Sequence, residues 1–306
     1  MRTNVDVHDC LGFAIKLALE AGEMIRAGQA KRFASQATTE STKSNSVDLV
    51  TEVDKAVEAF IYRRIKETFP DHAFIGEETY AGQSIPDAPT WIVDPIDGTT
   101  NFIHGYPMVA TSIGLAVGGI PIVGVVYNPF LDLLYSAAKG QGAYLNGTAR
   151  LPITGKPRPL ATLHDALIHV DIGASRTTNV LHSRLKTFGR LAGSPDQGGK
   201  MVHSLRSIGC ASLNLCLVAS GGQDMHWEIG CWPWDVCAGL CILAEAGGAA
   251  FGGKNTSLCG TVNAELLAGR KYLFVRAVAP EKGETGFAVQ RRLAHEFYDT
   301  TDDIEP

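Results

Sequence analysis

Acidic residues follow apolar, strand-like runs at several places in this 306-residue chain. The clearest case is segment 91–101, where a hydrophobic run leads into Asp94 and a proline, and Asp97 follows three residues after Asp94. On a continuous strand, residues three apart point to opposite faces, but a turn lets both carboxylates converge with the Ile96 carbonyl between them. Hard oxygen ligands of this kind suit Mg²⁺. An Asp-rich turn closed by local hydrogen bonds would show the same pattern.

The residues that follow Asp97 suit a phosphate group. Gly98 leaves backbone N–H groups free to approach an anion, and Thr99 adds a hydroxyl. The segment therefore predicts a metal site and a phosphate site side by side.

Two further acidic segments precede this one. Glu77 and Glu78 end the apolar run 74–75, and either a charged loop or a metal site explains them. Thr51 and Asp54 have the spacing of a capping box, which would account for Asp54 as a helix-starting residue. The functional alternative is that Asp54 orients a hydroxyl or a water at the metal centre. Lys43 is equally compatible with a loop position and a phosphate contact.

The fourth segment, 227–235, ends in Asp235 directly before a predicted helix. Asp235 either caps that helix or binds a metal at its N-terminus. Glu228 lies in a partly apolar run, where a buried acid requires a partner such as a sugar hydroxyl or a backbone donor. Together the four segments predict a cage for two metal ions, the arrangement that stabilises the attacking and leaving oxygens in phosphoryl hydrolysis.

Charge and composition exclude several other classes of protein. The net charge is −5 and the pI is near 6.0, so a clustered basic face for nucleic acid is not expected. The N-terminus lacks the apolar run of a signal peptide, and the uncharged stretch 105–131 is interrupted by glycine and proline, which favours buried strands over a membrane span. Seven cysteines without a CxxC pair favour packing in the core and a reducing, cytoplasmic compartment.

The elements that must position these acids alternate along the chain. Helical periodicity covers 10–27 and 52–69, with a polar loop over 35–46 between them. Strand-like runs at 91–93, 111–117, 122–127 and 133–137 predict an antiparallel meander, and the second half adds a strand at 166–170 and helices at 180–191, 210–219 and 236–246. The pattern predicts a layered α/β fold in one domain, residues 1–306, with lobes of about 1–155 and 156–306. The acidic tail after residue 301 is expected to be disordered.

These motifs resemble the inositol monophosphatase family, within the lithium-sensitive, magnesium-dependent phosphatase superfamily that includes fructose-1,6-bisphosphatase. The resemblance covers most of the chain to about residue 250. It implies alternating layers of helices and mixed or antiparallel sheets, a homodimer, and a phosphate monoester as substrate, with no nucleic acid or membrane as partner. The motifs that carry it are 48–54, 76–78, 94–101, 124–129, 206–212 and 234–248.

The resemblance also implies a role for each site residue. Two or three Mg²⁺ ions would be held by Glu77, Asp94, the Ile96 carbonyl, Asp97 and Asp235. Thr99, hydrogen-bonded to Asp54, would activate the attacking water. Glu77 would also be a catalytic group. Phosphate would lie on the amides of Gly98 and Thr99, and the sugar ring would meet Asp97, Gly209, Cys210, Ala211, Glu228 and Asp235. Cys210 and Pro233 depart from the usual family pattern, and both lie on the sugar side.

Three functions are compatible with this reading. The first is magnesium-dependent hydrolysis of inositol monophosphate to inositol and phosphate. The second is a broader phosphatase of the same superfamily, acting on a sugar bisphosphate, histidinol phosphate or a 3′-phosphonucleotide. The third is a metabolite-binding protein without catalysis, which usually loses a metal ligand or the water activator; here all of them are present.

Overall fold

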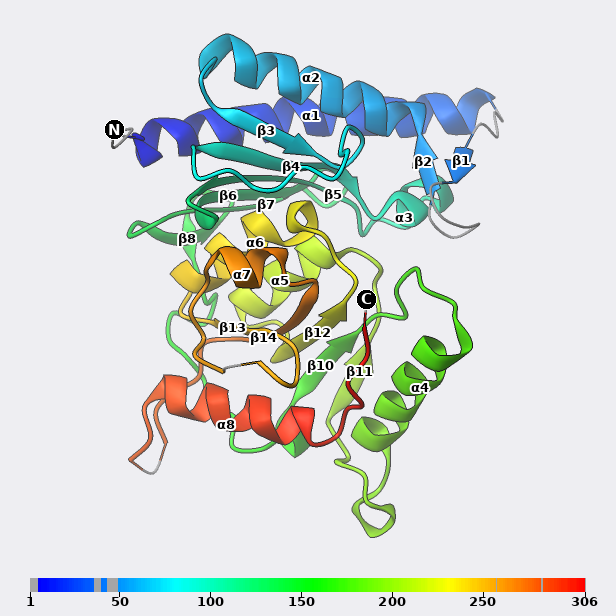
Figure 1. The fold of residues 1–306 in the computed structure, drawn as a ribbon, viewed down its shortest axis with the longest axis vertical. Helices are drawn as coiled ribbons and strands as arrows, with labels where there is room; N and C mark the ends of the chain where they lie inside the picture. Colours follow the sequence, from blue (N-terminus) through cyan, green and yellow to red (C-terminus); the bar gives the residue numbers. More distant parts are fainter. Residues whose placement is uncertain (1–4, 36–39, 43–48, 257, 282, 306) are drawn as a thin grey trace.

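The computed structural model describes residues 5–35, 40–42, 49–256, 258–281 and 283–305. The chain folds into alternating layers of helices and sheets, stacked from the N-terminal helices at the top of Figure 1 to helices α4 and α8 at the bottom. The helices are α1 (Val7–Ser35), α2 (Glu52–Thr68), α3 (Thr99–His104), α4 (Thr178–Ala192), α5 (Ala211–Ser220), α6 (Pro233–Glu245), α7 (Ala264–Ala268) and α8 (Gly286–Tyr298), with short 3-10 turns η1 (Leu163–Asp165) and η2 (Pro195–Gln197). The α/β layered fold expected from the sequence is confirmed.

A seven-stranded sheet forms the upper β layer. Its strands follow chain order across the sheet: β3 (Ala73–Gly76), β4 (Thr90–Asp97), β5 (Ala110–Val117), β6 (Ile120–Asn128), β7 (Leu133–Ala138), β8 (Gly142–Leu145) and β9 (Ala149–Arg150). β3 is parallel to β4, and every later pair is antiparallel, so the predicted meander is confirmed.

A five-stranded mixed sheet forms the lower β layer. Its order is β11 (Ser204–Arg206), β10 (Leu167–Val170), β12 (Met225–Ile229), β14 (Lys271–Val275) and β13 (Ala249–Phe251). β10 is parallel to both of its neighbours, and β14 is antiparallel to both of its own. A two-stranded antiparallel ribbon, β1 (Glu40–Thr42) and β2 (Leu49–Thr51), leads into α2. Part of the predicted polar loop 35–46 is therefore a strand.

The upper sheet is covered on both faces, which explains its continuous apolar strands. Trp91 and Val93 of β4 pack in a cluster with α1 and α2, and the intervening Ile92 packs in another cluster with α5 and α6. The second cluster also includes Phe274 of the lower sheet. Helices α5 and α6 are thus the layer between the two sheets, and this layer faces the acidic segments.

Candidate metal centre and active site

Three carboxyl groups meet where β4 ends. One ligand atom from each of Asp94, Asp97 and Asp235 lies within 4.8 Å of the other two. Pairing between β4 and β5 is regular up to Asp94, and its register shifts between Asp94 and Asp97. Because of this irregularity, two acids three residues apart join one cluster instead of facing opposite sides of the sheet.

Asp235 reaches the cluster from the first turn of α6. Its Oδ2 accepts a hydrogen bond of 2.6 Å from the backbone N–H of Trp232, the residue that precedes the helix. The capping explanation is therefore correct as a local description, and the same carboxyl group also lies in the acidic cluster. The rings of Trp232 and Trp234 stack 5.2 Å apart and hold this end of the helix.

Glu77 directly follows β3 and lies beside this cluster of three, since its charge raises the Asp94 pKa. Its backbone N–H donates to the Val93 carbonyl at 3.1 Å, which continues the β3–β4 pairing by one residue. The side chains of Glu77 and Asp94 share a hydrogen bond. The backbone N–H of Glu78 donates to Oε2 of the buried Glu58 at 2.7 Å, and the Glu78 charge contributes to the raised pKa of Asp54.

The electrostatics of this cluster favour a cation. Burial raises the pKa of Asp94, and the nearby charges of Glu77, Asp97 and Asp235 raise it further. The pKa of Asp235 is raised in the same way, first by burial and then by Asp97 and Glu77. Among the ion pairs of the described residues, none joins a lysine or arginine to Asp94, Asp97 or Asp235. An all-oxygen donor set of this charge fits Mg²⁺.

Asp97 also connects the upper sheet to α5. Its Oδ2 accepts from the Ser212 backbone N–H and from the Ser212 hydroxyl, both at 2.6 Å, and its Oδ1 accepts from the Ala211 N–H at 3.3 Å. The Cys210 thiol lies 3.2 Å from Oδ2. The start of α5 is therefore bound to this carboxylate, and burial raises the Asp97 pKa while the bonds from Ser212 oppose the rise.

The predicted pair of Thr99 and Asp54 is formed. The Thr99 hydroxyl lies 3.1 Å from Asp54 Oδ1 and 3.2 Å from the Ile96 carbonyl oxygen, so its single proton has two acceptors. The capping box is formed as well: Asp54 Oδ2 accepts from the Thr51 N–H at 3.0 Å. The two explanations of Asp54 are compatible because its two oxygens serve different partners. Burial raises the Asp54 pKa to about 6.

Gly98 precedes α3 in the left-handed conformation, with φ of +88°. A Cβ at this position would lie 2.9 Å from the Met108 carbonyl oxygen, so a side chain would be both strained and obstructed. The Asn101 side chain fixes the surroundings by donating to the carbonyls of Met108 and Ile208, each at 2.7 Å. The Gly209–Ala211 segment thus lies beside the Gly98 turn.

Glu228 lies on β12, 5% exposed. Its Oε1 accepts from the Ile229 backbone N–H at 2.9 Å, so one of the two partners considered for it, a backbone donor, is present. Burial raises the Glu228 pKa to about 8, with Arg184 opposing the rise. Arg184 Nη1 lies 4.0 Å from Glu228 Oε1.

Some sequence expectations fall outside the structure or are corrected by it. Lys43 and Asp48 lie outside the described residues. Cys259 is exposed, so packing in the core does not hold for every cysteine. The tail is not disordered over 302–305: Asp302 pairs with Arg190 at 2.8 Å, and Ile304 is 9% exposed.

Sequence reasoning missed Ser212, Asp171 and Arg184. Ser212 is one of few polar residues in the apolar run 210–219, and a polar residue in a buried helix requires a partner. Arg184 lies on the same helical face as Thr187 and Leu191, which are buried with it. Its position on this apolar face was a signal in the sequence that the arginine is buried and has partners. Asp171 carries no comparable signal in the sequence.

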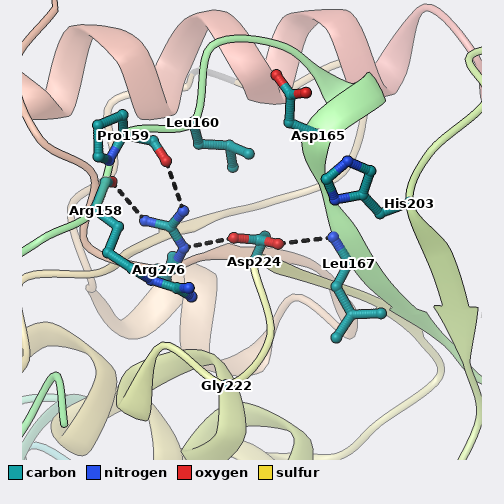
Figure 2. Close-up of a pocket in the computed structure, with 9 residues that line it drawn as sticks. All are labelled: Arg158, Pro159, Leu160, Asp165, Leu167, His203, Gly222, Asp224 and Arg276. Atoms are coloured by element: carbon teal, nitrogen blue, oxygen red, sulfur yellow. Dashed lines mark hydrogen bonds and ion pairs between the residues drawn. The ribbon is translucent and has the colours of Figure 1, made fainter. Parts of the chain in front are cut away.

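A separate cavity of about 500 Å³ lies by the lower sheet (Figure 2). Its buried charges are bound to the protein itself: Arg276 Nε donates to Asp224 Oδ1 at 2.6 Å, and Asp224 Oδ2 accepts from the Leu167 N–H at 2.7 Å. The other Arg276 donors bind the carbonyls of Arg158 and Pro159. This charged pair holds the connection before β10 to the lower sheet, and the acidic cluster does not line the cavity.

Comparison with known proteins agrees with this geometry. The sequence profile of the inositol monophosphatase family matches residues 6–286. Inositol monophosphatase 2 of Saccharomyces cerevisiae is 46% identical over 258 residues, which is 84% of this chain and 83% of the yeast protein. Quinic acid degradation cluster protein x of Neurospora crassa is 38% identical over 97% of this chain and 94% of its own length.

A solved structure shares the architecture. The inositol monophosphatase from Anabaena (Nostoc) sp. PCC 7120 superimposes with a TM-score of 0.73 and 27% sequence identity, over 98% of this chain and 99% of that one. With the family profile and the yeast relative, this likeness establishes that the chain belongs to the inositol monophosphatase family.

Proposed function

We propose that this phosphatase hydrolyses inositol monophosphate to inositol and inorganic phosphate, with Mg²⁺ as its metal. The observation that carries the proposal is the cluster of Asp94, Asp97 and Asp235 with the Thr99–Asp54 pair beside it. The names of the yeast and Anabaena relatives support inositol monophosphate as the substrate.

Five groups would hold the metal. They are the carboxylates of Glu77, Asp94, Asp97 and Asp235 and the carbonyl oxygen of Ile96. When bound, two or three divalent cations would supply Lewis-acid polarisation of the phosphate and neutralise charge as it develops. They would also relieve the repulsion that raises the carboxyl pKa values.

The chain's own groups would handle the proton and the phosphate. As the Thr99 oxygen takes a proton from a water molecule in line with the phosphorus, the hydroxyl proton of Thr99 would pass to Asp54 Oδ1, which already accepts its hydrogen bond. Asp54 must be ionised for this, and its pKa of about 6 leaves it mostly ionised above neutral pH. The backbone N–H groups of Gly98 and Thr99 would bind the phosphate oxygens.

The sugar would lie against the lower-sheet side of the site. Asp97 and the start of α5, residues 209–211, border this side together with Glu228 and Asp235. Burial raises the pKa of the Cys231 thiol, and the charges of Glu228 and Asp235 raise it further, which supports placing these two acids on one side of the site. Carboxylate oxygens accept hydrogen bonds from the hydroxyls of a polyol.

A second candidate is a phosphatase for another cyclic polyol phosphate. The observation in its favour is that the Neurospora relative, whose name refers to quinic acid degradation, aligns over 97% of this chain. The yeast inositol monophosphatase aligns over 84%. Broader sugar-phosphate activity of the superfamily is the remaining alternative.

A panel of phosphate monoesters tests the proposal. Phosphate release is measured with inositol 1-phosphate, a sugar bisphosphate, a 3′-phosphonucleotide and an aryl phosphate, at several Mg²⁺ concentrations, with and without Li⁺. We expect the highest kcat/KM for inositol 1-phosphate and no turnover in EDTA. A higher kcat/KM for another ester would reassign the substrate, and the absence of release at every Mg²⁺ concentration would indicate a binding protein.

Several further properties belong to the proposal. We include inhibition by Li⁺, a homodimer and a cytoplasmic location, as the family resemblance and the unpaired cysteines suggest. No helix among the described residues is long and apolar enough to cross a membrane.

A further inference from the structure

Arg184 is a buried cation in α4, a helix that supplies none of the groups assigned above. Its side chain is 2% exposed, and its guanidinium lies 5.9 Å from the Trp227 ring. Burying a guanidinium is unfavourable unless hydrogen bonds and an opposite charge compensate for the lost water. Its contacts should therefore show what it does.

Two of those contacts are backbone carbonyls at the ends of adjacent strands. Nη2 donates to the Ile229 carbonyl at 2.7 Å, and Nη1 donates to the Asp171 carbonyl. Ile229 ends β12, and Asp171 directly follows β10. The guanidinium fork thus fixes the ends of the two parallel strands that border the sugar side.

The acidic partner is Glu228: the guanidinium opposes the rise that burial causes in the Glu228 pKa and so favours its ionised form. Arg184 Nη1 lies 4.0 Å from Glu228 Oε1, the oxygen that also accepts the Ile229 N–H. A second basic side chain, His226, has its Nε2 3.8 Å from Glu228 Oε2. Burial lowers the His226 pKa to about 3, so this imidazole is neutral and leaves Arg184 as the positive charge beside the carboxylate.

Asp171 extends the same arrangement to the loop before α5. Its Oδ1 lies 3.2 Å from the Gly209 N–H and also accepts from the Ser207 hydroxyl at 2.5 Å. Arg184, by holding the Asp171 backbone, is therefore linked to both components of the sugar side, the Glu228 carboxylate and the Gly209 segment.

We propose that Arg184 is a positioning residue for sugar recognition: it fixes the Glu228 carboxylate and the adjoining strand ends in the orientation that receives the polyol hydroxyls. The inference rests on the proposed function, since it needs Glu228 to contact the sugar. Arg184 itself acts through Glu228 and is remote from the phosphate chemistry. Its loss should consequently affect polyol esters and spare esters without a polyol.

The experiment compares KM and kcat for inositol 1-phosphate and an aryl phosphate in Arg184→Met, Arg184→Lys, Glu228→Ala and the double variant Arg184→Met/Glu228→Ala. For Arg184→Met we expect KM for inositol 1-phosphate to rise about tenfold, the loss typical of a charged hydrogen-bonding partner, with the aryl phosphate changed less than about twofold. Arg184→Lys keeps the charge without the fork and should recover part of the loss. In the Glu228→Ala background, Arg184→Met should add little, because its target is gone.

Arg190→Met is the matched control, since Arg190 is on the same helix and forms a partly exposed pair with Asp302. It should leave both KM values unchanged. Suppose that Glu228→Ala raises KM for inositol 1-phosphate alone. If Arg184→Met then raises both KM values equally, or adds its full effect to that of Glu228→Ala, Arg184 is only structural. In that case the inference fails while the proposed function stands. If Glu228→Ala is not selective, the substrate assignment fails and the inference fails with it. Should Arg184→Met not fold, a wild-type ratio of KM values in Arg184→Lys overturns the inference.

Discussion

Asp97 combines a structural role with the metal-binding role that we propose for it. Two donors of Ser212 hold its Oδ2 at 2.6 Å, while an oxygen of the same carboxyl group lies in the cluster with Asp94 and Asp235. A ligand fixed in this way loses little side-chain freedom when an ion binds, so the site is preorganised. If Asp97 binds the metal as proposed, metal binding and the docking of α5 would be coupled through this carboxylate.

Asp94 lies centrally among the acids, and its replacement should be the most damaging single change. Asp94→Asn keeps the shape but removes one negative charge from the donor set. We expect kcat/KM to fall by on the order of 1,000-fold or more, since several kcal/mol of charge stabilisation is lost. Phosphate release and Mg²⁺ titration by calorimetry measure the effect. The exposed Asp299→Asn should behave as wild type, and a similar loss there would contradict a specific role for Asp94.

Thr99 should separate catalysis from metal binding. Thr99→Ala removes the hydroxyl that contacts Asp54 and the Ile96 carbonyl without changing a carboxylate. We expect kcat to fall about 100-fold, in the range of general acid–base contributions, while the Mg²⁺ concentration for half-activation stays near normal. Thr68→Ala, at the exposed end of α2, is the control. A loss of Mg²⁺ affinity in Thr99→Ala would overturn its assignment as water activator.

The raised carboxyl pKa values predict how the metal-free protein responds to pH. Because burial raises the Asp54 pKa from 3.8 to about 6, and raises those of Asp94, Asp97 and Asp235 too, the folded state binds more protons than the unfolded chain. Stability from these groups is complete below pH 3.8 and is lost as the pH rises through each folded pKa. In EDTA, the stability contributed by Asp54 should therefore fall from about pH 4 to just above pH 6, and that of the other three carboxyl groups should fall as the pH rises through their own raised pKa values.

Mg²⁺ should reverse this trend, since it binds the ionised carboxylates of the folded protein only. Thermal unfolding followed by circular dichroism at pH 5.5, 6.5 and 8, in EDTA and in Mg²⁺, measures both effects. The Asp94→Asn/Asp235→Asn variant should show a weaker pH dependence in EDTA. A Tm in EDTA that falls as steeply in this variant as in wild type would show that other groups cause the dependence.

At the level of elements, the site depends on the close approach of α6 to the upper sheet. A Cβ on Gly124 of β6 would lie 2.2 Å from the Ala238 carbonyl oxygen, and one on Gly114 of β5 would lie 2.5 Å from Cys237 Sγ. The absence of side chains at these two positions sets the distance between helix and sheet. Asp235 is in the first turn of that helix, so its distance from Asp94 depends on the same contact.

Gly124→Ala should therefore affect both stability and metal binding. The added methyl group would clash with the backbone of α6, which cannot move aside as a side chain can by changing rotamer. We therefore expect a loss of about 1–3 kcal/mol in the free energy of unfolding and a weaker Mg²⁺ affinity. Urea unfolding and Mg²⁺ titration measure the two effects. Gly12→Ala in α1, where a Cβ meets nothing within 4 Å, should be neutral or stabilising. If Gly124→Ala is destabilised but binds Mg²⁺ with normal affinity, the metal site does not depend on the contact between α6 and the sheet.

Local patterns predicted the elements well where they are long and buried. The strands β4 to β7 and the helices α2, α5 and α6 lie within a few residues of their predicted ranges, because both faces of these elements are apolar or their ends carry capping residues. The strand Glu40–Thr42 was missed because its sequence is polar, and its backbone pairing with β2 determines its structure. The acids of the cluster were predicted because they end apolar runs. Arg184 and Asp171 were not, because most of their partners come from distant segments.

At the scale of the whole molecule, one apolar cluster joins residues from both halves. It contains Ile75 and Tyr135 from the first half, Trp234 and Phe274 from the second, and much of α5 and α6. We propose on this basis that the two lobes form one cooperative domain. The layer order itself was implied by the family resemblance, since no local pattern states which helices cover which face of a sheet.

A single domain should unfold in one transition. Because α5 and α6 are packed against both the upper and the lower layers, neither lobe should keep its structure after the other is lost. Urea unfolding in EDTA, followed by tryptophan fluorescence and by far-ultraviolet circular dichroism, should give coincident midpoints. Two separated transitions would show that the lobes, about 1–155 and 156–306, are independent domains.

The position of α5 and α6 between the sheets has a consequence for synthesis on the ribosome. The strands of the upper sheet are complete once residue 150 has emerged, but the helices that cover its second face come from residues 211–245. Until then the nascent chain carries a wide, uncovered apolar surface around Val126 and Ala137. During this interval the nascent chain is most exposed to aggregation with other chains on the polysome, and binding of a chaperone would protect it.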